Sequence, residues 1–341
     1  MSVSSFNRCV ELALFLFIIS VVILFGFLLG PRANVRLGRY QLVLDTKLNT
    51  QERNQPDLLA LLADQVATQE RQYPSLISGT EKLVQFHNPE KPTKTEHVVL
   101  YLHGFSACRQ EISPVAENIA AQLQANFFAT RLTGHGMNAE QLAQATADDW
   151  LQDAIEAWQL ATQLGQKVVI IATSTGASLA TWLAQQHSVA EQSHSLILVS
   201  PNFRPNHWAM NVFLWPWAKF WLPLLVGRKK GRAPQDKIAA RYWTAPYPTS
   251  SLCHVAALAK AACQSDVASI QTPTLFIYCD DDKTVDSRVT DQVIKRWGSK
   301  RIRCLSEQAV EGTTNHVIVG DLARPESNHR ITEEILRFIH G

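Results

Sequence analysis

A serine stands at the junction of two contrasting stretches of this chain, where its hydroxyl could act as a nucleophile. The run Val168–Ala172 is apolar and rich in β-branched residues, and Ser174 follows it closely. Gly176 comes two places later, before a helical pattern that begins at Leu179. A strand, a sharp turn and a helix are the setting of the G-x-S-x-G nucleophile elbow, which exposes the hydroxyl above a sheet. Ala172 replaces the first glycine of that motif and keeps the position small.

A serine hydroxyl is a weak nucleophile unless a general base and an orienting acid activate it. Residues 273–279 have the pattern of a buried strand and lead into an acidic cluster. Parallel sheets keep their sites beyond the carboxyl ends of the strands. We therefore predict that Asp282 is the orienting acid. Asp280 or Asp281 could instead cap the turn, and Asp286 could cap the next helix.

The predicted base is His316, which lies in the polar loop 312–318 after a last strand near residues 300–305. A loop lets an imidazole reach across the sheet edge to the serine. His329 is the competing histidine, but it begins the final helical pattern, where a surface position is expected. Ser174, Asp282 and His316 then form a triad in the chain order Ser, Asp, His.

An oxyanion hole requires backbone N–H groups at a tight turn. Residues 98–105 have the pattern of a hydrophobic strand that opens into a His-Gly turn. We predict that the N–H groups of Phe105 and of Thr175, directly after the nucleophile, hold the oxyanion. His103 is expected to be packed and hydrogen-bonded in the structure, and it is also a candidate substrate contact.

Four stretches, in this order, resemble the α/β-hydrolase superfamily, and within it serine esterases and lipases similar to carboxylesterases, monoacylglycerol lipases and lysophospholipases. They are His103–Phe105, Arg131–Gly136, Thr146–Asp153 and the elbow around Ser174. The resemblance runs from about residue 80 to the C-terminus. It implies a mostly parallel central sheet with helices on both faces and an inserted helical cap. It also implies that the turn at residues 134–136 shapes the entrance of the active site.

The N-terminal part of the chain is far more apolar than the part that carries these motifs. Residues 12–30 are almost unbroken apolar sequence, near the length that a helix needs to cross hydrocarbon. The Gly30-Pro31-Arg32 sequence that follows argues against a cleaved signal peptide. We therefore predict one uncleaved transmembrane helix and a membrane localisation. Cations follow the span at Arg32, Arg36, Arg39 and Lys47, which favours a cytoplasmic catalytic domain, although the opposite side stays open.

These features predict three segments. Residues 1–31 form the transmembrane anchor, residues 32–78 a stalk or linker with a helix, and residues 79–341 the catalytic domain with a cap at about 202–268. The chain contains six cysteines without a disulfide framework, which fits a reducing compartment.

The predicted cap is rich in tryptophan. Four of the nine tryptophans fall between Trp208 and Trp221, and Pro216 and Pro223 forbid one long straight helix. A basic run follows at residues 228–232. The cap could contact a lipid surface, or its aromatic side chains could line an acyl pocket and never meet lipid. Both alternatives predict a hydrophobic substrate, and the candidate substrate-binding residues are Trp208, Trp215 and Trp217.

Composition excludes several other functions. The net charge of +2 predicts no nucleic-acid partner, and the sequence has no metal-binding or dinucleotide motif, so no metal or cofactor is expected. The predicted function is a membrane-anchored serine hydrolase that cleaves esters of hydrophobic acyl groups, such as a monoacylglycerol or lysophospholipid. The alternatives are an acyltransferase with the same triad, a hydrolase of amide, peptide or carbon–carbon bonds, and an inactive membrane-tethered scaffold. The oligomeric state stays open.

Overall fold

The computed structural model describes residues 3–35, 37, 56–231, 234 and 236–341, and a seven-stranded sheet lies at its centre. The strand order is β1-β3-β2-β4-β5-β8-β9. β1 is antiparallel to β3, and every other neighbouring pair is parallel. The strands are β1 (Leu83–Gln85), β2 (Thr95–Leu102), β3 (Asn126–Ala129), β4 (Gly165–Thr173), β5 (Ser193–Val199), β8 (Thr274–Cys279) and β9 (Ile302–Glu307).

Alternation of side chains along the central strands produces a core on each face of the sheet. In β4, Val168, Ile170 and Ala172 belong to one apolar cluster, whereas Val169 and Ile171 belong to another. All five side chains are completely buried. A strand covered on both faces must be apolar throughout, which is why β4 has the continuous hydrophobic pattern of a parallel strand.

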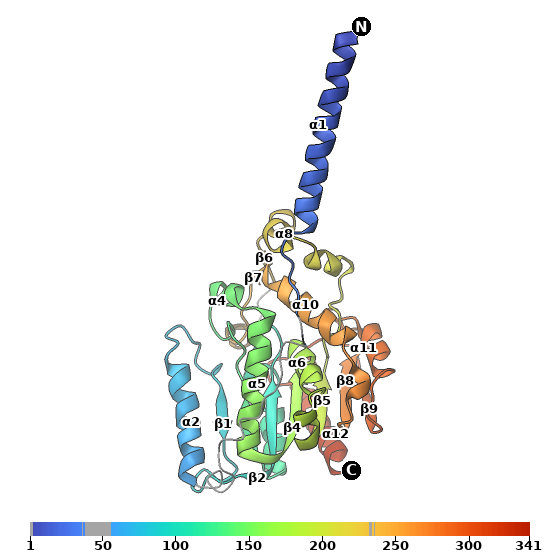
Figure 1. Ribbon diagram of the computed structural model, residues 1–341. Helices are drawn as coiled ribbons and strands as arrows, with labels where there is room; N and C mark the ends of the chain where they lie inside the picture. Colours follow the sequence, from blue (N-terminus) through green and yellow to red (C-terminus); the bar gives the residue numbers. More distant parts are fainter. Residues whose placement is uncertain (1–2, 36, 38–55, 232–233, 235) are drawn as a thin grey trace.

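Helices cover both faces of the sheet (Figure 1). On one face, α5 and α6 pack against β2 and β4, while on the other α3 packs against α12. The helices of the sheet layers are α3 (Val115–Gln122), α4 (Ala139–Gln144), α5 (Ala147–Leu164), α6 (Thr175–Leu183), α7 (His187–Gln192), α11 (Ser287–Ile294) and α12 (Asn328–His340). Short 3-10 helices are η3 (Arg109–Glu111), η5 (Val267–Ser269) and η6 (Pro325–Ser327). The architecture is the α/β-hydrolase fold that the sequence predicted.

A mostly helical segment is inserted between β5 and β8, where the sequence predicted a cap. Its elements are η4 (Trp208–Leu214), α8 (Ala218–Val226), β6 (Lys229–Lys230), α9 (Lys237–Arg241), β7 (Tyr247–Pro248) and α10 (Ser251–Gln264). The apolar run breaks between η4 and α8, where Trp217 has a left-handed backbone with φ of 61°. Pro223 lies inside α8. A small apolar cluster that includes Phe213, Leu222 and Cys253 holds η4, α8 and α10 together.

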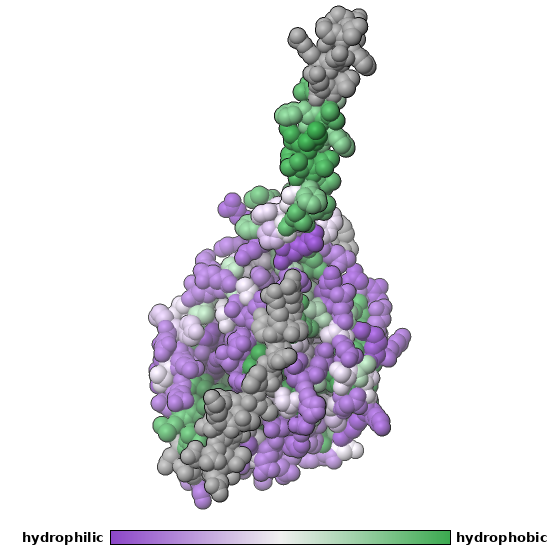
Figure 2. All heavy atoms as spheres, viewed as in Figure 1, coloured by the Kyte–Doolittle hydropathy of each residue, from purple (hydrophilic) through white to green (hydrophobic). Residues whose placement is uncertain are grey.

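The predicted membrane anchor is wrong. α1 (Val3–Leu28) stands away from the body at the end where α8 lies (Figure 1), and apolar side chains cover its described part (Figure 2). Yet within the described ranges no helix combines the length and hydropathy of a membrane span. The predicted membrane localisation, with a cytoplasmic catalytic domain, falls with the anchor.

α2 (Pro56–Arg71) lies in the segment predicted as a stalk with a helix, and it packs on the body. Leu59 and Val66 are buried in the same core cluster as the helices α5 and α6. Glu70, near the end of α2, forms a two-pronged ion pair with Arg131 at 2.6 and 2.8 Å, and both side chains are almost completely buried. Residues 38–55 of the predicted stalk lie outside the described residues.

Candidate active site

Ser174 lies on a strained turn between β4 and α6. Its φ of 52° and ψ of −115° belong to a region that side chains with a Cβ rarely adopt. The turn is held at the sheet because the Ser174 N–H donates to Val199 O at 2.9 Å, and Ser174 O accepts the Asn202 N–H at 3.1 Å. Gly176 is required here, since a Cβ at that position would lie 2.2 Å from Leu102 O. Ala172, which replaces the usual first glycine, fits inside the core.

His316 reaches the serine from the loop after β9. Its Nε2 lies 2.9 Å from Ser174 Oγ and its Nδ1 lies 2.7 Å from Asp282 Oδ2. A hydrogen bond holds the backbone of this loop at His316, because Ser200 Oγ, which follows β5, donates to His316 O at 2.6 Å. With Nδ1–H donated to the carboxylate, Nε2 is free to accept the serine proton.

Asp282 follows the C-terminal end of β8 and is 3% exposed. Its Oδ1 accepts the N–H groups of Thr284 at 2.7 Å and Val285 at 3.0 Å, which leaves Oδ2 to face His316. The other acids of the cluster have separate roles. Asp286 caps α11 by accepting the Arg288 N–H, and Asp281 accepts a bond from the Asn315 amide at 3.3 Å.

The electrostatic surroundings raise the pKa of His316 above its ordinary value of 6.5. Burial of the imidazole acts in the lowering direction, but the charge and hydrogen bond of Asp282 outweigh it, and the charge of Glu111 adds to the rise. A raised pKa makes His316 a better proton acceptor, provided that the pH is high enough for the imidazole to be neutral before it reacts.

The two predicted oxyanion donors come from the start of α6 and from the turn after β2. Thr175 is the first residue of α6, so its N–H has no acceptor within the helix. Phe105 follows Gly104 at the end of β2. A Cβ at Gly104 would lie 3.2 Å from Ser174 Cβ, so the turn that carries the Phe105 N–H passes directly beside the nucleophile.

His103 is engaged by the backbone on both sides of its ring. The Leu132 N–H donates to its Nε2 at 3.0 Å, so Nδ1 carries the proton and donates to Gly104 O at 2.8 Å. Burial lowers the pKa of His103 to about 4, which keeps the ring neutral. The ring is completely buried. These surroundings support the packed role that the sequence predicted for His103 rather than a contact with substrate.

The stretch Thr146–Asp153, which is another of the motifs that resemble the α/β-hydrolases, holds the turn after Arg131 in place. Thr146 and Asp149 form a capping box at the start of α5. Further along this helix, Trp150 Nε1 donates to Thr133 O, and Asp153 accepts both the N–H and the hydroxyl of Thr133. These side chains therefore fix the backbone beside the site and do not supply reacting groups.

Two of the three tryptophans predicted to bind substrate are described. Trp215 and Trp217 are 52% and 41% exposed, and their ring neighbours are Trp221 and Phe220 of the cap. The Trp217 N–H also donates to Pro31 O at 2.8 Å, which attaches the end of the N-terminal segment to the cap. The side chain of Trp208 lies outside the described residues.

The sequence analysis missed Glu111, the last residue of η3. This carboxyl is 3% exposed, and its Oε2 accepts both the Gly104 N–H at 2.8 Å and the Tyr101 hydroxyl at 2.9 Å. The available signal was weak: an acid next to the apolar Ile112, seven residues beyond the glycine of the oxyanion turn.

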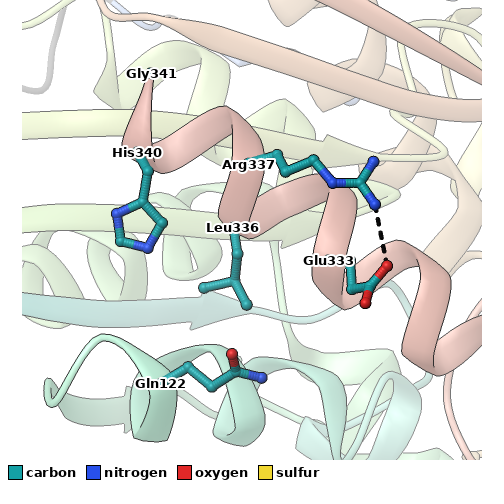
Figure 3. Close-up of a pocket in the computed structure, with 6 residues that line it drawn as sticks. All are labelled: Gln122, Glu333, Leu336, Arg337, His340 and Gly341. Atoms are coloured by element: carbon teal, nitrogen blue, oxygen red, sulfur yellow. Dashed lines mark hydrogen bonds and ion pairs between the residues drawn. The ribbon is translucent and has the colours of Figure 1, made fainter.

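A surface hollow elsewhere on the molecule carries no comparable chemistry. It lies between α3 and α12, where Arg337 pairs with Glu333 at 3.0 Å (Figure 3). Its lining residues are Gln122, Glu333, Leu336, Arg337, His340 and Gly341. Over the described ranges, no three His, Cys, Asp or Glu side chains are grouped as a metal site. The hydrogen-bonded serine, histidine and aspartate are the arrangement of a serine hydrolase on the α/β-hydrolase fold.

Comparison with known proteins gives the family. Residues 93–309 match the Hydrolase_4 family, described as "Serine aminopeptidase, S33". Because this match covers more than half of the chain, the protein belongs to that family, among hydrolases of the carboxylesterase and lipase type.

Individual relatives agree with this assignment. A thermostable monoacylglycerol lipase of Bacillus sp. (strain H-257) is 30% identical over 118 residues, which are 34% of this chain and 43% of the relative. The chain thus matches less than half the length of that lipase. Among solved structures, a metagenome-derived lipolytic enzyme of the LipS and LipT study has a TM-score of 0.63 at 19% identity, over 78% of this chain and 99% of the other. A soluble variant of the Saccharomyces cerevisiae monoglyceride lipase has a TM-score of 0.52 at 12% identity, over 78% and 97% of the two chains. At such identities these structures establish the fold alone.

Proposed function

We propose that the protein is a serine hydrolase that cleaves carboxylic esters of hydrophobic acyl groups through an acyl-enzyme. The observation that carries this proposal is the continuous hydrogen-bonded chain from Asp282 through His316 to Ser174, at 2.7 and 2.9 Å. All three side chains are at least nine-tenths buried, and the serine lies on a strained turn. Strain of this kind persists only where the surrounding structure holds it, and it is common at reacting groups.

The reaction begins when Ser174 Oγ attacks the ester carbonyl carbon and His316 Nε2 takes the hydroxyl proton. The charged imidazole is stabilised by Asp282, and the carbonyl oxygen becomes an oxyanion held by the N–H groups of Phe105 and Thr175. Collapse of this intermediate breaks the ester bond, and His316 gives its proton to the leaving alcohol. Water then attacks the acyl-enzyme with the same base, which releases the acid and restores the serine.

A lipid-like acyl ester is the substrate class that we favour. The relative named a monoacylglycerol lipase supports it, as does the apolar cap. α8 carries exposed apolar side chains beside the cations Arg228 and Lys229, and a surface of this composition suits contact with the lipid aggregates in which such esters occur. The exposed apolar residues of α8 are Phe220, Leu224, Leu225 and Val226, and Trp215 and Trp217 are exposed just before it.

Fluorophosphonate labelling tests the activated serine. The wild-type protein is expected to react, and Ser174→Ala and His316→Ala are expected to lose the label. His329→Ala is the matched control, because His329 is 86% exposed and pairs with Glu333, away from the triad. Absence of labelling in folded wild-type protein, or labelling that survives Ser174→Ala, would contradict the proposal.

A series of p-nitrophenyl esters from acetyl to palmitoyl tests the substrate class. We expect kcat/KM to rise with acyl length. Leu224→Ser and Leu225→Ser should weaken hydrolysis of micellar substrate more than of monomeric substrate. Leu61→Ser, at another exposed leucine that lies on α2, should change neither. Cleavage restricted to acetyl and butyryl esters would remove the lipid part of the proposal and leave the serine hydrolase.

Two other reactions use the same triad. The family description favours an aminopeptidase as a second candidate. Such an enzyme needs a carboxylate for the substrate's amine, but Asp236 in the cap is occupied as the N-cap of α9, where it accepts the Ile238 and Ala239 N–H groups. Hydrolysis of aminoacyl p-nitroanilides tests this reaction. Product analysis with added acceptor alcohols tests acyl transfer.

A further inference from the structure

Glu111 is a buried acid that the reaction scheme leaves without a role. It lies at the end of η3, between β2 and α3, and its side chain turns back to the end of β2. Burial raises its pKa, while the bonds from the Gly104 N–H and the Tyr101 hydroxyl act in the opposite direction. A buried carboxyl is costly unless it is hydrogen-bonded, so a position this deep requires an explanation.

The carboxyl holds the turn that carries one half of the oxyanion hole. Its Oε2 accepts the Gly104 N–H at 2.8 Å, and the next N–H along the chain is that of Phe105. Gly104 is confined between two groups, because a Cβ there would lie 2.7 Å from Glu111 Oε1 and 3.2 Å from Ser174 Cβ. A shift of the Glu111 carboxyl would therefore move the turn relative to the nucleophile.

Tyr101 extends the hydrogen bonds of Glu111 to the strand that ends at the nucleophile. Its hydroxyl donates to Glu111 Oε2 at 2.9 Å and lies 3.1 Å from Thr173 Oγ1. Thr173 is the residue directly before Ser174, at the end of β4. Three hydrogen bonds in series thus connect the turn that carries Phe105 with the strand that carries the nucleophile.

We propose that Glu111 is a positioning residue that fixes the Gly104–Phe105 turn beside Ser174, so that the Phe105 N–H meets the oxyanion. This inference rests on the proposed function, because the oxyanion forms only if Ser174 attacks a carbonyl. Preorganised donors stabilise the transition state and contribute little to binding of the ground state. Loss of the positioning oxygen should therefore lower kcat and leave KM nearly unchanged.

The decisive experiment compares Glu111→Leu with Glu111→Gln. Both substitutions remove the charge and keep a side chain of similar volume, but only glutamine retains an oxygen that can accept the Gly104 N–H. We expect Glu111→Leu to lower kcat about 100-fold, the loss typical of one oxyanion-hole donor, with KM within about threefold. Glu111→Gln should keep kcat within about fivefold of the wild type. Equal kcat in the two variants, or a loss confined to KM, would overturn the proposal.

Two further variants separate positioning from stability. Asn126→Leu removes another buried side-chain oxygen that accepts a backbone N–H, that of His87, at the start of β3, and it should lower the melting temperature with kcat within about threefold. If Glu111→Leu does not fold, Glu111→Asp withdraws the oxygen by one methylene and keeps the charge. We expect this variant to lose kcat, and full kcat in it would also overturn the proposal.

Ser174→Ala distinguishes failure of this inference from failure of the proposed function. Loss of fluorophosphonate labelling in Ser174→Ala, together with wild-type kcat in Glu111→Leu, would refute the role of Glu111 alone. Labelling that survives Ser174→Ala would refute the function itself, and with it the inference.

Discussion

Asp282→Asn should remove almost all activity without a change of shape, because the protein fixes which way the new amide points. In the native site, Oδ1 of Asp282 accepts two backbone N–H groups, those of Thr284 and Val285. An asparagine must keep its carbonyl oxygen there, so its NH₂ group faces His316 Nδ1. Two donors cannot meet, and the imidazole must therefore carry its proton on Nε2, the atom that has to accept the proton of Ser174.

The size of the activity loss follows from the free-energy cost of turning the asparagine amide the other way. Turning the amide to restore the active tautomer would place its NH₂ group against the two N–H groups and leave them unpaired. Each unpaired buried donor costs about 1–3 kcal/mol, so the active arrangement lies about 2–6 kcal/mol higher. At about 1.4 kcal/mol per factor of ten, kcat/KM should fall by about 30- to 20,000-fold.

The assay is the rate constant of fluorophosphonate labelling beside kcat/KM for a p-nitrophenyl ester. Asp281→Asn is the matched control, because Asp281 is about half exposed and lies one residue away. We expect it to keep nearly full activity. A folded Asp282→Asn protein with more than a tenth of the wild-type activity, or an equal loss in Asp281→Asn, would refute the assignment of the acid and the tautomer argument together.

Three further predictions follow from the site and the core. Because the pKa of His316 is raised and only the neutral imidazole accepts a proton, kcat/KM should rise with pH through a midpoint above 6.5, measured as a pH–rate profile. Gly176→Ala should sharply lower the melting temperature, since the new Cβ would lie 2.2 Å from Leu102 O. Glu70→Gln should lower the free energy of unfolding in urea by about 3–5 kcal/mol, because it leaves the Arg131 guanidinium buried without its partner charge.

Each of these predictions has a control or a contrary result. A pH midpoint below 6.5 would contradict the electrostatic account of His316. Gly26→Ala should leave the melting temperature unchanged, since a Cβ there meets nothing within 4 Å. Asp281→Asn, which removes an exposed ion pair with Lys283, should change the free energy of unfolding by less than about 1 kcal/mol. A loss in Glu70→Gln no larger than that value would mean that the buried pair adds little to stability.

The arrangement of Ser174, Asp282 and His316 could be anticipated because each follows a recognisable strand. The carboxyl ends of parallel strands lie on one edge of a sheet, so residues far apart in the chain are expected to meet there. The structure brings the three within hydrogen-bonding distance. Their catalytic role stays a prediction until the labelling experiment is done.

Glu111 could not be found in this way. The polar residues Arg109 and Gln110 precede it, and an acid in such a stretch ordinarily lies on the surface. Its burial arises from tertiary packing, because η3 folds back under the end of β2. The anchor prediction failed for a different reason: it was made from the length of the apolar run and from the sequence that follows it, and over the described residues no helix meets the requirement for a span.

The hydrogen bond between His316 and Ser174 joins residues that are 142 positions apart in the chain. Contacts of such long sequence separation form slowly, because closing the long intervening loop costs entropy before the contact is made. Pairing of β4, β5, β8 and β9 has to be complete before the imidazole reaches the hydroxyl. We therefore expect reactivity toward a fluorophosphonate to return last during refolding, after tryptophan fluorescence and secondary structure. The reactivity of the nucleophile then reports when the part of the sheet from β4 to β9 is complete.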